Sequence, residues 1–226
     1  MLKQLENGYA MNESSRPRNW VAKVQRFVRD PGVAKAVLEH CDLCSQIIPA
    51  KHAHLVEPDK HRIHCACQGC DTLLGDREDR KFVRVPEDTR MLRDFRLSDM
   101  EWDALGIPIG LAFFFYSTPE RRILALYPGP AGPTESLLTL DAWSGLVARN
   151  PVLSELQPDV EALLVNRIND PHEYYAAPID RCYALVGLIR THWRGIAGGD
   201  EAWKAINGFF ASLRGPTNGS GASSHG

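Results

Sequence analysis

Two pairs of cysteines stand at the spacing with which short turns chelate metal ions. Cys41-Asp-Leu-Cys44 and Cys67-Gln-Gly-Cys70 are separated by residues 45 to 66. Two such pairs face to face supply a closed tetrahedral set of thiolates, with metal–sulfur distances of about 2.3 Å. We therefore predict that Cys41, Cys44, Cys67 and Cys70 hold one metal ion. Zinc is favoured because four thiolates leave no open position, and iron in a rubredoxin-like centre is the alternative.

The segment between the two pairs contains further residues that bind metals. A fifth thiol, Cys65, could replace Cys67 as a ligand, point into the core as a small hydrophobic residue, or take part in a cluster. His52 or His54 could substitute for one thiol, which would give a mixed ligand set. The remaining histidines of this segment are His61 and His64. The alternative for these histidines is a solvated loop, which we expect for His61.

Composition excludes several classes of protein. The 226 residues include 26 Lys plus Arg and 28 Asp plus Glu, a net charge of −2 that argues against a dedicated nucleic-acid binder. The longest uncharged apolar run, Ile107 to Tyr116, is too short to cross a bilayer, and the N-terminus lacks the apolar core of a signal peptide. We therefore expect a cytoplasmic protein, whose clustered cysteines stay reduced and favour metal binding over disulfides.

The metal ion requires elements that position its ligands, and the chain divides into segments accordingly. We predict a flexible N-terminus (1–18), a helical lead-in (19–40), a Cys-rich metal-binding module (41–75), an α+β domain (76–214) and a disordered tail (215–226). Thirty residues rich in Cys, His and turn formers cannot build a conventional core, so a metal would organise the module. The fold class is α+β, with a small metal-bound knuckle module packed on a larger domain of antiparallel sheet and helices.

Within the larger domain, apolar patterns predict the individual elements. Strands are expected at 82–85, 107–116 and 123–127, the last two joined by a turn at 117–121. Residues 127–134 are expected to form a rigid loop, and Thr134 with Glu135 to start a helix. Further helices are predicted at 97–105, 158–167, 179–193 and 200–213, with Asp180 and Asp200 as N-caps of the last two.

A second candidate site lies on the predicted helix 179–193. Tyr183, Arg190 and Arg194 share one face with Gly187, and two guanidinium groups could bind a carboxylate or phosphate of a ligand or partner. The alternative is a surface salt-bridge face. Cys182 lies on the apolar side and is predicted to be a core thiol. The chain contains no G-x-S-x-G and no H-E-x-x-H motif, so no catalytic residue is assigned.

A set of motifs resembles an uncharacterised family whose genes tend to lie beside those of actinobacterial-type [NiFe]-hydrogenases. Besides the two cysteine pairs, the set comprises His52-Ala-His54-Leu55-Val56, Cys65-Ala-Cys67, Trp102-Asp-Ala-Leu-Gly-Ile-Pro108, Tyr127-Pro-Gly-Pro-Ala-Gly132, Pro158-Asp-Val-Glu-Ala-Leu-Leu-Val-Asn-Arg167 and Pro178-Ile-Asp-Arg-Cys-Tyr183. The resemblance runs from about Cys41 to Leu213. It differs from a rubredoxin in having Ser45 where glycine is expected after the first pair.

The resemblance, together with the thiolate site, implies an accessory protein that helps to assemble a [NiFe]-hydrogenase. Its partner would be a hydrogenase subunit or a co-assembly factor. The alternative is a rubredoxin-like iron electron carrier that serves the hydrogenase. A third hypothesis is an enzyme that uses the Arg190/Arg194 pocket, for which the sequence offers no nucleophile or base.

Overall fold

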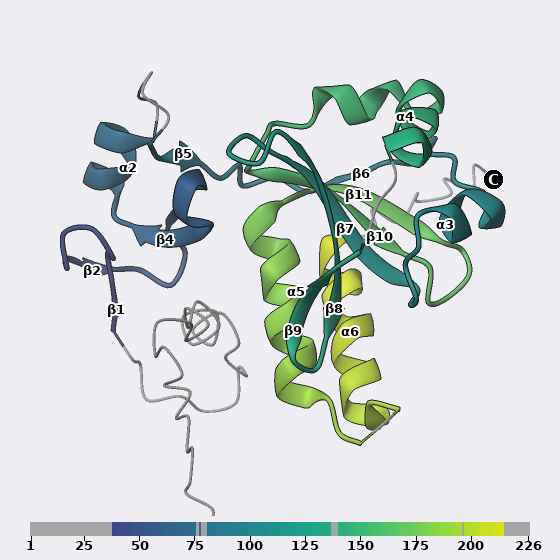
Figure 1. The fold of residues 1–226 in the computed structure, drawn as a ribbon. Helices are drawn as coiled ribbons and strands as arrows, with labels where there is room; N and C mark the ends of the chain where they lie inside the picture. Colours follow the sequence, from purple (N-terminus) through teal and green to yellow (C-terminus); the bar gives the residue numbers. More distant parts are fainter. Residues whose placement is uncertain (1–37, 76, 78–80, 137–139, 196, 215–226) are drawn as a thin grey trace, which may run out of the picture.

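The computed structural model describes residues 38–75, 77, 81–136, 140–195 and 197–214 (Figure 1). The predictions for the flexible N-terminus, for the tail and for most of the helical lead-in lie outside these residues. The described chain combines antiparallel sheets with helices, so the predicted α+β class is confirmed.

A six-stranded antiparallel sheet forms the centre of the larger domain. Its strand order is β6 (Arg90–Met91), β11 (Glu173–Pro178), β10 (Glu161–Asn166), β7 (Leu111–Ser117), β8 (Arg122–Gly129) and β9 (Gly132–Glu135). The β7–β8 hairpin pairs Phe114 with Ala125, as the sequence predicted for two strands joined by a short turn. The first of these strands starts at Leu111, four residues later than expected.

Helices cover both faces of this sheet. The α5 (Ile179–His192) and α6 (Gly199–Leu213) helices pack on one face, while α3 (Asp99–Ala104), α4 (Leu140–Arg149) and the 3-10 turn η3 (Pro151–Glu155) pack on the other (Figure 1). Along β7, Phe113 contributes to the first core and Phe114 to the second. A strand buried on both faces is apolar at every position, which explains the run of aromatic residues in β7.

The prediction of a helix at 158–167 is wrong, because this segment forms the central strand β10. All six residues of β10 are buried, and their side chains supply both cores. The sequence Glu-Ala-Leu-Leu-Val-Asn therefore lacks the polar and apolar alternation that marks a half-exposed strand. Neighbouring strands on both sides stabilise the extended conformation.

The expected loop at 127–134 and the expected helix start at Thr134 are also wrong. Both segments belong to the β8–β9 hairpin, in which Tyr127 pairs with Thr134 and Gly129 with Gly132. Strand pairing on β8 overrides the local turn signals of the prolines and glycines. The α4 helix begins only at Leu140.

The last two helices were placed correctly, but their caps were not. The N-cap residues are Pro178 for α5 and Gly198 for α6, and neither Asp180 nor Asp200 caps a helix. Gly198 has a φ of 85°, a left-handed conformation that glycine adopts without strain. Asp180 instead interacts with His54, a residue that lies far away in the sequence.

The Cys-rich segment forms two small sheets and a short helix. The β1 (Glu39–His40) and β2 (Ile47–Ile48) strands make a hairpin, and β4 (Arg62–Ala66), β3 (Ala53–Glu57) and β5 (Val83–Arg84) form a three-stranded sheet. The 3-10 turn η2 (Pro58–Lys60) joins β3 to β4, and α2 (Gln68–Leu74) follows β4. Val56 and Ile63 pack into the same core as α5 and α6, which fixes this module against the larger domain.

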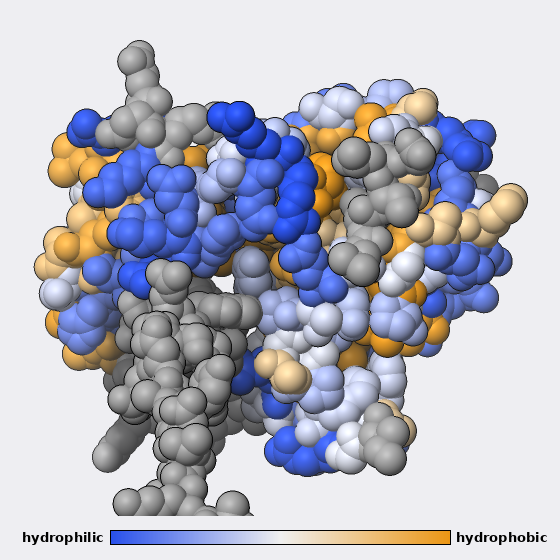
Figure 2. All heavy atoms as spheres, viewed as in Figure 1, coloured by the Kyte–Doolittle hydropathy of each residue, from blue (hydrophilic) through white to orange (hydrophobic). Residues whose placement is uncertain are grey.

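Surface hydropathy differs across the module. In Figure 2 its visible front is mainly hydrophilic, and hydrophobic residues gather along its outer edge. Three of the large apolar side chains that are more than half exposed belong to this module, namely Leu38, Ile47 and Leu73. Exposed apolar side chains of this size mark surfaces that bind other molecules when they are contiguous.

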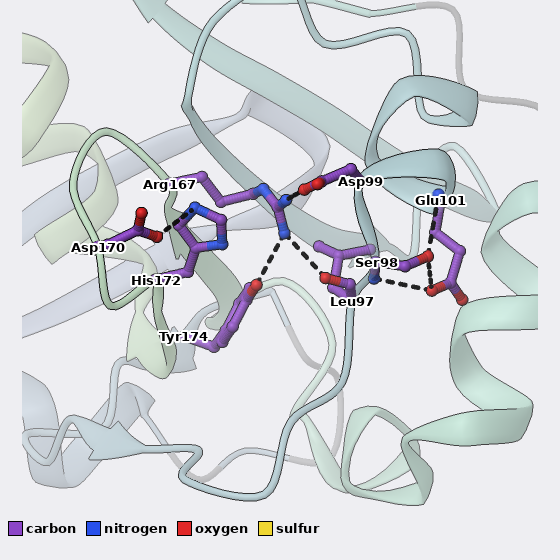
Figure 3. Close-up of polar contacts among 8 residues, drawn as sticks. All are labelled: Leu97, Ser98, Asp99, Glu101, Arg167, Asp170, His172 and Tyr174. Atoms are coloured by element: carbon purple, nitrogen blue, oxygen red, sulfur yellow. Dashed lines mark hydrogen bonds and ion pairs between the residues drawn. The ribbon is translucent and has the colours of Figure 1, made fainter.

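A buried arginine joins α3 to the sheet (Figure 3). Arg167 follows β10, and its Nη1 donates hydrogen bonds of 2.9 Å to the carbonyl of Leu97 and to the hydroxyl of Tyr174. Its Nη2 pairs with the carboxylate of Asp99, and its guanidinium lies 5.6 Å from the ring centroid of Trp102. These contacts hold the start of α3 against the end of β10.

Candidate metal centre

The first cysteine pair lies in the turn between β1 and β2. Cys41 follows β1, and its backbone N–H donates to the carbonyl of Gln46 at 2.7 Å, which closes the turn. Ser45 has a φ of 64°, and its N–H donates to the carbonyl of Cys41 at 2.9 Å. Glycine was expected at this position because it adopts the left-handed conformation more easily. Ser45 adopts that conformation here.

The second pair lies at the start of α2. Cys67 is the N-cap residue, and its Sγ accepts a hydrogen bond of 3.4 Å from the backbone N–H of Cys70. The β3–β4 hairpin follows β2 in the sequence between the two pairs and returns the chain to the first turn. The backbone N–H of Asp42 donates to the carbonyl of Cys65 at 2.8 Å, which ties the first turn to the end of β4.

This arrangement brings the four predicted ligands together. The sulfur atoms of Cys41, Cys44, Cys67 and Cys70 all lie within 4.8 Å of one another, and the Sγ atoms of Cys44 and Cys67 are 3.6 Å apart. Sulfur atoms at the corners of a tetrahedral zinc–thiolate site are separated by about 3.8 Å, given bonds of about 2.3 Å. None of the cysteines forms a disulfide. The group could therefore hold a metal ion.

The electrostatics of Cys41, Cys44 and Cys70 favour a bound cation. Burial disfavours the thiolate of Cys41, but backbone hydrogen bonds, led by that from Cys67, outweigh it and lower its pKa to about 7. At Cys44 the hydrogen bond from Gln46 favours the thiolate, but the sulfurs of Cys41 and Cys67 prevail and raise its pKa. Burial and the neighbouring sulfurs raise the pKa of Cys70. A bound cation would offset the repulsion between neighbouring thiolates and allow all four to form.

The alternate ligands form a group of their own. The ligand atoms of His52, His54 and Cys65 lie within 4.8 Å of one another. The other two histidines lie elsewhere: His61 is exposed, as expected, beside Glu120 at 3.3 Å, whereas buried His64 contacts Glu57 at 3.2 Å.

The candidate face on α5 differs from its prediction. Tyr183 packs edge-on against the ring of Phe113 at 5.6 Å, and burial raises the pKa of its hydroxyl. Gly187, which was predicted to share this face, is buried. Arg194 lies beyond the end of α5, and its Nη1 donates to the carbonyls of Thr191 and Trp193. Arg190 is half-buried. A role of Tyr183, Arg190 and Arg194 in partner binding stays a prediction.

Cys182 lies where the apolar stripe of α5 placed it. Its side chain is fully buried, and burial raises the pKa of the thiol well above its ordinary value. Sequence reasoning missed the contact between His54 and Asp180, whose residues are 126 positions apart. No local pattern carries that signal, because the contact depends on how the module packs on α5.

The fold and the cysteine group define an α+β protein with a candidate metal site in its N-terminal module. A family model, described as a family of unknown function (DUF5947), matches residues 40–217, and the chain belongs to this family. No curated protein matches the chain, and no solved structure does. Among the described residues, none of the helices combines the length and the apolar composition that crossing a membrane requires.

Proposed function

We propose that this protein is a metal-binding accessory protein that holds one zinc ion through Cys41, Cys44, Cys67 and Cys70 and acts by binding a partner protein. The observation that carries the proposal is the convergence within 4.8 Å of four sulfur atoms from two segments that are distant in the sequence. Zinc fits because four protein thiolates complete its tetrahedral coordination and leave no position for a substrate. The ion would act as a structural staple that fixes the module's surface.

An iron electron carrier is the second candidate, and one observation favours it. Cys44 is exposed, whereas Cys41 and Cys67 are buried. An iron ion in this group would thus have one ligand at the surface, through which electrons could pass to a partner. Iron uses the same four sulfurs as zinc, so the metal itself distinguishes the two functions.

The partner is proposed from two features. The family resemblance suggests a [NiFe]-hydrogenase subunit or a co-assembly factor as the client. The exposed apolar side chains of Leu38, Ile47 and Leu73 lie on the module that the metal would stabilise, and they supply a surface for a protein partner. Free thiols at the site suit a reducing compartment, so we place the function in the cytoplasm.

Metal analysis tests the site. Protein expressed with zinc and iron both supplied is expected to contain one equivalent of zinc and to be colourless. Cys44→Ser should lose the metal and loosen the module, because a structural metal supplies much of the folding free energy of so small a unit. Cys182→Ser, a cysteine outside the group, should keep the metal. A red, iron-loaded protein would favour the electron carrier, and less than half an equivalent of any transition metal would refute the site.

Co-purification tests the client. The protein is captured from a host that makes the hydrogenase, in parallel with Leu73→Asp and with Met100→Asp, which places a charge at an exposed position on α3. Loss of a hydrogenase subunit in Leu73→Asp alone is expected. Loss in Arg190→Glu with Arg194→Glu, while Leu73→Asp still binds, would move the interface to α5. If no hydrogenase subunit is captured by any form, the proposed client is wrong.

A further inference from the structure

A second group of metal-binding side chains lies on one face of the β3–β4–β5 sheet. In the antiparallel register of β3 and β4, His54 stands directly opposite Cys65. Side chains of directly opposed residues project to the same face, and so do those two positions apart along a strand. His52 precedes His54 by two positions, and the two rings meet edge to face with centroids 4.8 Å apart. The register thus gathers two imidazoles and one thiol.

Hydrogen bonds fix the orientation of both imidazoles. His52 Nδ1 lies 2.8 Å from the carbonyl oxygen of Pro49, and His54 Nδ1 lies 2.8 Å from Oδ2 of Asp180. A carbonyl or carboxylate oxygen only accepts, so each Nδ1 donates, and in the neutral imidazole the Nε2 atom then presents a lone pair to a metal ion. This pattern, in which an imidazole donates from one nitrogen and binds a metal through the other, is the usual support of histidine ligands.

The surroundings of the His52 ring favour a bound ligand. The His52 side chain is only 7% exposed, and its Nε2 is buried without a hydrogen-bond partner. Burying an imidazole nitrogen in this way removes its hydrogen bonds to water, and this costs free energy unless a ligand binds the nitrogen. The Glu39 carboxylate lies 3.5 Å from Nδ1 of the same ring and would help to compensate the charge of a cation.

We propose that His52, His54 and Cys65 form a second metal site, distinct from the four-cysteine group, which takes a borderline divalent transition-metal ion such as Zn²⁺ or Co²⁺. Imidazole and thiolate donors select such ions over Mg²⁺ and Ca²⁺. Three protein ligands leave the fourth coordination position to water or to a donor from another molecule, so this ion would exchange, unlike one held by four thiolates.

Residues around this site belong both to the Cys-rich module and to the larger domain. A cavity of about 490 Å³ is lined by His52 together with Cys67, a member of the four-cysteine group. Asp180, which orients His54, belongs to α5 and also accepts a hydrogen bond of 2.7 Å from the backbone N–H of Arg181. Asp180 is therefore a positioning residue: it holds a ligand in place from the larger domain without touching the ion.

Equilibrium dialysis of the full chain against increasing Zn²⁺, followed by elemental analysis, tests the proposal. Wild-type protein is expected to bind a first, tight equivalent and a second, weaker one. His54→Ala and Cys65→Ala should lose the second equivalent and keep the first. Asp180→Asn should weaken the second equivalent by about 10- to 100-fold. His61→Ala, an exposed histidine at the end of the same hairpin, should bind both equivalents normally.

A Co²⁺ titration of protein loaded with a single equivalent of Zn²⁺ gives an independent readout. The cobalt that then binds should add thiolate-to-cobalt absorption in wild type and in His61→Ala, but none in Cys65→Ala. Binding of one equivalent only by the wild type would overturn the second site, as would loss of the tight equivalent in Cys65→Ala. If no tight equivalent is bound while a weaker one depends on His54, the second site stands and the four-cysteine proposal fails.

Discussion

The Nη1 of Arg167 donates a hydrogen bond of 2.9 Å to the hydroxyl of Tyr174, and so links the end of β10 to the adjacent strand β11. The same nitrogen donates to the carbonyl of Leu97, just ahead of α3. One guanidinium therefore fixes two strands and the helix that covers them. Its side chain is nearly fully buried, so both acceptors depend on it for their hydrogen bonds.

Substitution of Arg167 is expected to be costly. Arg167→Lys would retain the charge, but the single ammonium on the shorter lysine side chain could not keep the contacts of both Nη1 and Nη2, and we expect a loss of about 2 kcal/mol in the free energy of unfolding. Asp99→Asn is the control, because that carboxylate is 89% exposed and its ion pair is worth at most about 1 kcal/mol. Urea denaturation measures both variants, and equal losses would contradict a special role for the buried guanidinium.

The capping box of α3 predicts a pH-dependent stability. Glu101 accepts hydrogen bonds from the side chain and the backbone of Ser98, and these bonds lower the pKa of its carboxyl group. A lowered pKa stabilises the fold above the ordinary range of Glu, near pH 4.5, and this contribution is lost as the pH falls through the folded pKa. Ser98→Ala should cost about 1 kcal/mol at pH 7 and less at pH 3.5. In a Glu101→Gln background, the cost of Ser98→Ala should not vary with pH over this range.

Replacing either of two glycines with alanine should change the free energy of unfolding, but in opposite directions. A Cβ at Gly110 would lie 3.0 Å from the backbone carbon of Arg167, so Gly110→Ala should lower the free energy of unfolding by about 1–3 kcal/mol. A Cβ at Gly145, on an exposed position of α4, meets nothing within 4 Å, so Gly145→Ala should raise it by about 0.5–1 kcal/mol. Thermal denaturation of both variants decides this, and a neutral Gly110→Ala would show that the strand ends can separate.

Thiol alkylation should distinguish the cysteines by burial. Burial raises the pKa of Cys182, with the nearby charge of Asp180 as a second cause, so iodoacetamide should leave this thiol unmodified until urea unfolds the protein. Exposed Cys44 should become reactive in the folded protein once a chelator removes the metal. Mass spectrometry of the alkylated peptides reads out both effects, and early modification of Cys182 would mean that α5 opens locally.

The sequence was most informative where contacts are local. The cysteine pairs span four residues each, so their spacing alone indicated a turn that gathers sulfur atoms, and the β7–β8 hairpin was visible from its apolar strands and turn. The apolar side of α5 likewise predicted the burial of Cys182.

Long-range packing explains what the sequence did not predict. The central strand β10 is buried on both faces, so its apolar pattern has no period of two and does not distinguish a strand from a helix. Residues 132–135 pair with β8 despite their proline, because a strand at the edge of a sheet tolerates it. The separation of His52, His54 and Cys65 from the four-cysteine group depends on the register of β3 and β4, which spacing alone does not specify.

The hydrogen bond between His54 and Asp180 limits how the protein can be dissected. A fragment that ends after α2 would contain every proposed ligand of both metal sites, yet it would lack β5, which completes the small sheet, and the carboxylate that orients His54. Such a fragment could report on the four thiolates but would understate the affinity of the histidine site. During synthesis on the ribosome, all four cysteines emerge early in the chain. The second site is complete only later, when α5 has been made and supplies Asp180.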